Sequence, residues 1–457
     1  YCTQDVTVNT KLYHKLVSMG LDQEVLDIEF RAQEICLEQS KFGFQFDYTK
    51  AEKLKETLET EMATLQEEIH SVLGGCFIIP LEVKVPKRTT SYTEVLRGTY
   101  TAGCAYTNIK IKEFNPTSRH DLSTRLIERC GWKPEVFGDD KKPTLSEEVL
   151  IKKEERIYKL IAKQMMIQKR LGMLCDGQQA WMKLYNEETK AIHGRIDTLG
   201  TGTHRCTHSK PNLGQIPSTR APYGKECREL FTVPKGWKMY DTDLSGIELR
   251  MLAHYMFSFD DGAYADVILN GDIHVHNQEA AELASRAMAK VFAYADLYGS
   301  GIQNLAKVCN MSVKEMKVKK AAYNNNLPAL KTLKDKVVEA AEFRGYVKAL
   351  DGRRIPVRSS HSALNFLLQS AGAIVAKYWM VFSHNILRDM GYTHGVEFRQ
   401  SAFIHDQYDL AFDPDKITSD ILDEASKKAL DKVQELLSIK IRLDCESSVG
   451  NNFAEVH

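Results

Sequence analysis

The chain has 457 residues, of which 43% are hydrophobic and 27% charged, which is typical of a globular protein with two or more subdomains. No run of about 18 apolar residues predicts a membrane span, and the residues after Tyr1 do not predict a signal peptide. The ten cysteines have no metal-ligand or disulfide spacing and are expected to be free thiols. The net charge is zero, which argues only weakly against a nucleic-acid-binding protein, because acids elsewhere can balance a basic groove.

The N-terminal part predicts two helical stretches. Residues 1–40 carry apolar positions at helical spacing, and Phe42-Gly43-Phe44 ends the pattern. A second helix is expected from Thr49 to Gly74-Gly75, because apolar residues recur at steps of three and four, at Leu54, Leu58, Met62, Leu65, Ile69 and Leu73. A stripe this narrow on a highly charged helix is typical of a projecting antiparallel hairpin.

The remaining elements alternate between helical and mixed segments. A small sheet is expected over 79–85 and 109–111, where apolar residues alternate, and helix is expected over 118–186. Residues 190–250 are mixed, 260–345 helical almost throughout, and 346–457 alternate short strands with helices. This order predicts a split α/β core with two helical projections.

Two segments place carboxylates at the ends of predicted strands. In the run from Tyr240 to Arg250, Asp243 follows an apolar strand and precedes a helix; considered alone, an ordinary helix start explains this segment equally well. Asp406 lies between two short apolar strands, at the tip of a predicted hairpin. Because Mg²⁺ takes oxygen ligands, Asp243 and Asp406 are a candidate metal-binding pair.

Two further segments carry candidate binding residues. Arg286, Lys290, Tyr294 and Tyr298 recur every fourth residue and so share one helix face, which can bind a triphosphate and stack on a base; a solvated face with a buried aromatic end is the ordinary alternative. The run from Thr203 to Pro217 is rich in polar side chains and predicts a loop suited to backbone or minor-groove contacts with DNA.

Together and in this order, these segments resemble the family A (DNA polymerase I-like) DNA polymerases, especially the replicative enzymes of short-tailed bacteriophages. Further similar segments extend over most of the chain, at 114–119, 271–274, 350–354, 364–373 and 443–446. The resemblance implies an α/β (α+β) right-hand fold. The implied parts are an exonuclease remnant (1–20), the thumb with connecting helices (21–189, with a short thumb insertion at 76–112), the palm (190–259 and 346–457) and the fingers (260–345).

The resemblance also implies the roles of individual residues. Asp243 and Asp406, with the Leu244 carbonyl, match the catalytic metal ligands of the family. The implied nucleotide-binding residues are His274, Arg286, Lys290, Tyr294, Glu248 (against the ribose 2′-OH) and Tyr298. The implied DNA-binding residues are Arg205, Gln215, Lys169, Arg170, Asn365, Gln369 and His405.

The implied activity is template-directed extension of a primer 3′-OH with deoxynucleoside triphosphates, using two Mg²⁺ ions, for which Mn²⁺ can substitute. Primer-template DNA is the implied partner, with a processivity factor at 76–112, for which thioredoxin is one candidate, and a replicative helicase-primase as further partners. No membrane association is expected. The implied location is the cytoplasm of a bacterial host, with an organelle matrix as the alternative.

Four departures from the family pattern affect these expectations. Gln407 follows Asp406 where the family usually has Glu, His204 stands where Gly is usual, and Ala295 follows Tyr294 where the phage enzymes tend to have Gly. The segment 76–112 is shorter than the insertion that binds thioredoxin in the phage enzymes, which weakens that expectation.

The remaining expectations concern exonuclease activity and two alternative functions. Tyr1 and Asp5 resemble the last motif of a proofreading exonuclease, whose other carboxylates are absent, so exonuclease activity is not expected. Glu248 argues against a single-subunit RNA polymerase, which would not keep a barrier to the 2′-OH. A non-catalytic DNA-binding subunit is disfavoured by the joint retention of five residues, Asp243, Asp406, Arg286, Lys290 and Tyr294.

Overall fold

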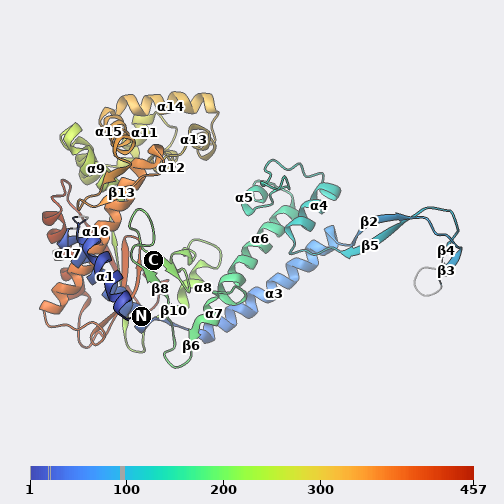
Figure 1. Cartoon of the computed structure of the whole chain (residues 1–457), viewed down its shortest axis with the longest axis horizontal. Helices are drawn as coiled ribbons and strands as arrows, with labels where there is room; N and C mark the ends of the chain where they lie inside the picture. Colours follow the sequence, from blue (N-terminus) through green and yellow to red (C-terminus); the bar gives the residue numbers. More distant parts are fainter. Residues whose placement is uncertain (1, 19, 21, 93–97, 457) are drawn as a thin grey trace. The chain divides into compact units, whose positions relative to one another are not determined.

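The computed structural model describes residues 2–18, 20, 22–92 and 98–456, which form two compact units (Figure 1). Unit 1 comprises Tyr1–Tyr48 with Leu184–His457, and unit 2 comprises Thr49–Lys183. Tyr1, the first residue of the predicted exonuclease motif, lies outside the described residues. The other residue of that motif, Asp5, lies on α1 (Cys2–Ser18), a helix with no buried residue.

The centre of unit 1 is a four-stranded antiparallel sheet. Its strand order is β14 (Phe398–Ile404), β15 (Gln407–Phe412), β11 (Lys238–Leu244) and β16 (Cys445–Gly450). Helices α2 (Gln23–Phe42), α16 (Ala363–Asp389) and α17 (Ser419–Leu436) accompany it, and α16 packs against both α2 and α17. The stretch 360–389 is long and apolar enough to cross a membrane, but 83% of its most apolar window is buried inside the protein. α16 is therefore a core helix.

A helical segment lies between β11 and the following strands, as predicted for 260–345. It contains α9 (Ile247–Asp260), α10 (Ala263–Asn270), α11 (Ile273–Ala281), α12 (Arg286–Leu297), α13 (Ile302–Val308), α14 (Val313–Asn326) and α15 (Pro328–Arg344). Three of these helices have a side-chain N-cap. Asp272 caps α11, Ser285 caps α12, and Ser312 forms a capping box with Glu315 on α14. The hairpin of β12 (Tyr346–Lys348) and β13 (Arg354–Pro356) and the short helix η3 (Ser360–Ser362) follow.

Small sheets complete unit 1. One has the strand order β10 (Phe231–Thr232), β1 (Phe44–Phe46), β7 (Ala191–Ile192) and β6 (Tyr185–Asn186). A separate hairpin pairs β8 (Arg195–Asp197) with β9 (Thr207–Ser209), so residues 198–206 form its connecting loop. The turn η2 (Leu213–Gln215) and α8 (Gly224–Glu229) follow this hairpin along the chain.

Unit 2 confirms the predicted long helix and small sheet. The predicted apolar stripe is buried on α3 (Tyr48–Leu73), and β2 (Cys76–Lys84) pairs antiparallel with β5 (Tyr106–Glu113). The other elements are β3 (Thr90–Tyr92), β4 (Gly98–Tyr100), α4 (Arg119–Cys130), α5 (Glu147–Leu150), α6 (Arg156–Leu171), η1 (Gly172–Asp176) and α7 (Trp181–Leu184).

The expectation of helix throughout 118–186 needs correction. Residues 131–146 are not helical, because Gly131 ends α4 in the left-handed conformation and two prolines follow, at 134 and 143. Helix α2, which the sequence analysis grouped with the thumb and its connecting helices (21–189), packs on α16 and β14 within unit 1. The helical periodicity of α2 could not show which unit its apolar face would join.

Candidate active site

Two carboxylates, one on β11 and one in the turn before β15, meet at one end of the central sheet. Asp243 on β11 lies opposite Gln407 on β15, and the Leu244 amide donates a hydrogen bond to the Asp406 carbonyl at 3.1 Å. His405 adopts a left-handed backbone conformation (φ 60°) in the turn that joins β14 to β15. The strand pairing therefore brings the predicted pair Asp243 and Asp406 together.

The surroundings of these carboxylates favour a bound cation. Desolvation raises the pKa of Asp243 to about 7, with further contributions from the negative charges of Asp406, Asp241 and Glu446. Burial likewise raises the pKa of Asp406. The described residues contain no group of three or more Cys, His, Asp or Glu residues that could hold a metal. Two carboxylates nevertheless fit Mg²⁺, which commonly binds one or two of them together with water and substrate phosphates.

A buried acid pair lies on the same sheet face as Asp243. Asp241 is opposite Asp409, and the Gln407 amide donates to both carboxylate oxygens of Asp409 at 3.1 Å. Burial raises the pKa of both acids, and the nearby charge of Arg228 partly opposes this effect. Sequence reasoning missed this pair, although Asp241 and Asp409 each lie two residues from a position already considered and so share its strand face.

Helix α12 presents cations and aromatic rings beside the carboxylates. The Arg286 Nε donates to Asp272 at 2.7 Å, and Lys290 is exposed one turn further along. The Tyr294 ring lies 6.3 Å from the His274 ring and 6.2 Å from the Tyr298 ring, measured between centroids. The charges of Glu248 and Asp406 add to burial in raising the pKa of Tyr294, which places this side chain near the carboxylates. The sequence analysis missed Asp272 as a partner of Arg286. Asp272 is exposed, and it also caps α11.

A chain of hydrogen bonds joins the end of α12 to the loop 198–206. The Tyr298 hydroxyl donates to Glu248 Oε2 at 2.6 Å, and Arg205 Nη2 donates to Glu248 Oε1 at 2.8 Å. Both Glu248 oxygens are thus engaged. The structure brings together three residues that the sequence analysis had assigned separately to the nucleotide and to DNA.

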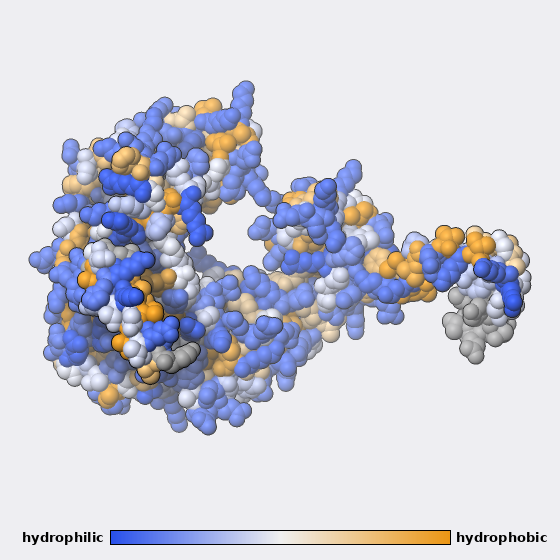
Figure 2. Space-filling model, viewed as in Figure 1, coloured by the Kyte–Doolittle hydropathy of each residue, from blue (hydrophilic) through white to orange (hydrophobic). Residues whose placement is uncertain are grey.

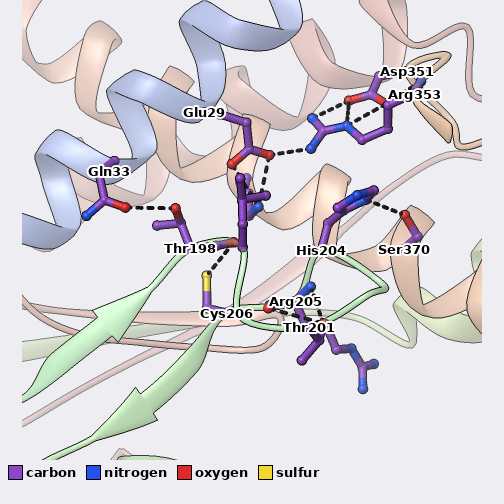
Figure 3. A network of polar contacts seen from close by, with 12 residues as sticks. Glu29, Gln33, Thr198, Thr201, His204, Arg205, Cys206, Asp351, Arg353 and Ser370 are labelled. Carbon is purple, nitrogen blue, oxygen red and sulfur yellow. Dashed lines mark hydrogen bonds and ion pairs between the residues drawn. The ribbon is translucent and has the colours of Figure 1, made fainter. Parts of the chain in front are cut away.

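A buried charged network lies behind this loop (Figure 3). Lys377 donates to both oxygens of Glu29 at 2.9 Å, and Arg353 donates to Glu29 at 2.5 Å and to Asp351 at 2.6 Å. Two acids and two bases balance one another, so the network can be buried without net charge. It connects α2 with α16 and with the turn between β12 and β13. Sequence patterns could not reveal it, because Glu29, Lys377 and the Asp351–Arg353 pair lie far apart along the chain.

The remaining predicted DNA-binding residues lie in different surroundings. Gln215 is exposed on η2; Asn365 and Gln369 are partly buried on α16, where Gln369 accepts a hydrogen bond from Thr203 at 3.5 Å. In unit 2, Lys169 is exposed at the end of α6, whereas Arg170 is 7% exposed. Adjacent helical residues point about 100° apart, so the Arg170 side chain points into the protein while Lys169 is exposed. A role of Arg170 in DNA binding stays a prediction.

The opposite face of α12 is held by a buried acid. Asp296 forms ion pairs with Lys320 on α14 and with Lys334 on α15, the latter at 2.5 Å. Burial lowers the pKa of Lys320 to about 8, although the Asp296 charge opposes this shift. The two cations exceed the single acid by one charge, so Lys320 loses its proton more easily in the folded protein than in the unfolded chain.

This shift predicts a pH-dependent stability difference. A folded-state pKa of about 8, below the ordinary value of 10.5, contributes stability that is full above pH 10.5 and is lost as the pH falls through 8. The free energy of unfolding of the parent minus that of Lys320→Met should therefore rise between pH 8 and 10.5, by about 3 kcal/mol at most. Urea denaturation across this range measures it. The exposed Lys317 on the same helix supplies the control Lys317→Met, for which the difference should stay flat.

The chain is similar to known proteins in both sequence and fold. A family model described as DNA polymerase family A matches residues 96–455. The DNA-directed DNA polymerases of Enterobacteria phage T3 and Escherichia phage T7 are 33% and 32% identical to this chain, over 100% of this chain and 76% of each relative. The solved "POL domain of Pol1 from M. smegmatis complex with DNA primer-template and dNTP" has a TM-score of 0.74 at 18% identity, and the match covers 95% of this chain and 73% of that one.

A mixed α/β fold with two carboxylates at a sheet edge, beside a helix of cations and aromatic rings, is the architecture of a nucleotide-polymerising enzyme. The chain belongs to DNA polymerase family A. Its activity is template-directed DNA synthesis in DNA replication, which makes it a nucleotidyltransferase. The predicted family, fold class and enzyme class are thereby confirmed.

Proposed function

We propose that this polymerase extends the 3′ end of a DNA primer paired with its template, using deoxynucleoside triphosphates and two Mg²⁺ ions held by Asp243 and Asp406. The observation that carries this proposal is the meeting of these two carboxylates at the sheet edge, where desolvation and mutual charge raise the pKa of Asp243 to about 7. Bound metal would activate the primer hydroxyl and neutralise charge on the leaving pyrophosphate. Mn²⁺ can take the same oxygen ligands.

The surrounding residues are assigned the roles that the family resemblance implies, supported by their positions. Arg286 and Lys290 bind the triphosphate, and Arg286 exchanges its Asp272 partner for phosphate oxygens. His274 lies beside them, where burial and both positive charges lower the pKa of its ring, so it contacts the phosphates as a neutral donor. Tyr294 stacks on the incoming nucleotide, and Tyr298 lies near the templating base. Leu244 contributes its backbone carbonyl to the metal site. Arg205, Gln215, Asn365, Gln369 and His405 line the primer-template, with Lys169 contacting the backbone.

We assign the parts of the right hand accordingly. Residues 190–259 and 346–457 with the central sheet form the palm, 260–345 the fingers, and unit 2 most of the thumb. The N-terminal residues to about 20 are the proposed exonuclease remnant. The phage relatives support a location in the cytoplasm of a bacterial host, with an organelle matrix as the second candidate.

Primer extension tests the proposed function directly. A labelled primer on a DNA template, with deoxynucleotides and Mg²⁺, should be extended to the template end. Omission of Mg²⁺ with a chelator should abolish extension, and Mn²⁺ should restore it. Efficient extension with ribonucleotides instead would point to an RNA polymerase, and binding without extension to a non-catalytic subunit.

Glu248→Ala is expected to increase ribonucleotide incorporation at least tenfold relative to deoxynucleotides, about 1.4 kcal/mol. Glu248 is the residue proposed to exclude the 2′-OH, and its removal also frees Arg205 and Tyr298. Single-nucleotide incorporation kinetics with both substrates measure the ratio. Glu279→Ala, an exposed acid on α11, is the matched control. Unchanged sugar selectivity in Glu248→Ala would contradict the assignment.

We further propose that a processivity factor binds the hairpin of β2 and β5. Apolar side chains are exposed along both strands, as Figure 2 shows, among them Ile78 (68%), Leu81 (61%), Val83 (68%) and Ile111 (63%). So many exposed apolar residues on one two-stranded element mark a protein-binding surface. A replicative helicase-primase is the second candidate partner.

Thioredoxin serves as the probe for this surface. Product length from a single binding event should rise when thioredoxin is added to the parent, and should not rise for Val83→Glu with Ile111→Glu. Extension without thioredoxin should be equal in both. No response of the parent would exclude thioredoxin as the partner of this hairpin.

A further inference from the structure

His204 has a backbone conformation that a histidine rarely adopts. Its φ is 62°, in the left-handed region where the Cβ atom is crowded and where glycine is favoured. Family A enzymes usually have glycine at this position, as noted for the sequence. A side chain that persists in this conformation must be held by its surroundings. The contacts of His204 therefore identify what the side chain does.

The His204 ring joins the loop 198–206 to helix α16. Its Nδ1 lies 3.3 Å from the Ser370 hydroxyl, and the neighbouring Thr203 hydroxyl donates to Gln369 on the same helix. Figure 3 shows His204 directed toward Ser370. Burial, together with the charges of Arg353 and Lys377, lowers the pKa of His204 to about 4. The ring is thus neutral and acts through a hydrogen bond.

Other contacts hold the two ends of the same loop. Thr198 donates to Gln33 of α2 at 3.0 Å, and the Arg205 amide donates to the Thr201 hydroxyl at 3.0 Å. His204 is the residue directly before Arg205, so the direction of its backbone sets where the Arg205 side chain begins. That side chain donates to Glu248, which also accepts from Tyr298.

We propose that His204 is a positioning residue for sugar selection: through Ser370 it fixes the loop that holds Arg205 against Glu248. The inference rests on the proposed function, in which Glu248 excludes the ribose 2′-OH. A glycine at this position would adopt the same backbone conformation without the link to α16. Arg205 would then orient Glu248 less tightly, and a ribonucleotide would meet a weaker barrier.

The test compares His204→Gly, Ser370→Ala and the double variant. His204→Gly keeps the backbone conformation and is expected to fold. Each single variant should reduce the preference for deoxynucleotides over ribonucleotides, measured as the ratio of kcat/KM values, by about three- to tenfold. Both single variants remove the same contact, between His204 and Ser370. The double variant should therefore reduce the preference for deoxynucleotides no more than either single variant does. Ser438→Gly is the matched control, since Ser438 is exposed, has a φ of 50° and lies outside the site. It should relieve the same backbone strain and leave selectivity unchanged.

The outcomes separate this inference from the proposed function. Loss of selectivity in Glu248→Ala and Arg205→Ala, with parental selectivity in His204→Gly and Ser370→Ala, overturns the role of His204 alone. Additive losses in the double variant also overturn it, because they would show two independent effects. If Glu248→Ala and Arg205→Ala keep parental selectivity as well, the proposed sugar-selecting site itself is wrong.

Discussion

Asp243→Ala and Asp406→Ala are each expected to slow primer extension on the order of 10³-fold or more, about 4 kcal/mol in activation free energy. The two carboxylates meet at the end of the sheet, and a metal bound there would act on charge that develops in the transition state. Primer-template affinity should change little, because that binding uses other surfaces. Single-turnover extension measures the rate, and a DNA-binding titration measures the affinity.

Folding of these variants provides an internal check. Desolvation and the charges of neighbouring acids raise the pKa of the Asp243 carboxyl, so its removal should not lower the free energy of unfolding. Asp415→Ala, at an exposed aspartate after β15, is the control and should keep parental activity. Near-normal extension by either site variant would remove that residue from the metal site.

Gln407→Glu is expected to lower the free energy of unfolding by about 3 kcal/mol. The buried Gln407 amide donates to both oxygens of Asp409, and a glutamate offers no N–H and adds a third carboxyl beside Asp241 and Asp409. Burial already raises the pKa of both acids, so a further negative charge is unfavourable. Urea denaturation at neutral pH measures the loss, and Gln303→Glu at an exposed position should show none.

A second substitution should restore this stability. In Gln407→Glu with Asp409→Asn, the new amide can donate to the new carboxylate, so at least half of the lost free energy should return. Activity measured where both variants are folded should stay within about tenfold of the parent, about 1.4 kcal/mol in activation free energy, if Asp243 and Asp406 suffice. Parental stability in Gln407→Glu alone would falsify the role of the acid pair. An inactive parent that regains extension through Gln407→Glu would contradict the two-carboxylate mechanism.

Local sequence patterns were sufficient wherever one element carries the information. The stripe from Leu54 to Leu73 predicted the buried face of α3, because helical periodicity reports burial directly. The strand ending at Asp243 and the hairpin around Asp406 were predicted in the same way, since alternation and a polar tip are local features. The motif order over the whole chain established the polymerase family. Local patterns failed at 131–146, where Gly131 ends α4 and two prolines follow, and they could not show which unit α2 would join.

Tertiary structure alone decided which of these residues meet. Strand pairing placed Asp241 beside Asp409 and made Gln407 their donor, a relation that no spacing along the chain could show. Folding also joined Arg205, Glu248 and Tyr298, which belong to three separate segments. His204 is the sharpest case: the sequence showed a histidine where glycine is usual, and only the backbone angle and the Ser370 contact gave it a role. The physical reason is that hydrogen bonds and charge interactions depend on distance in space, whereas sequence patterns record only burial and local conformation.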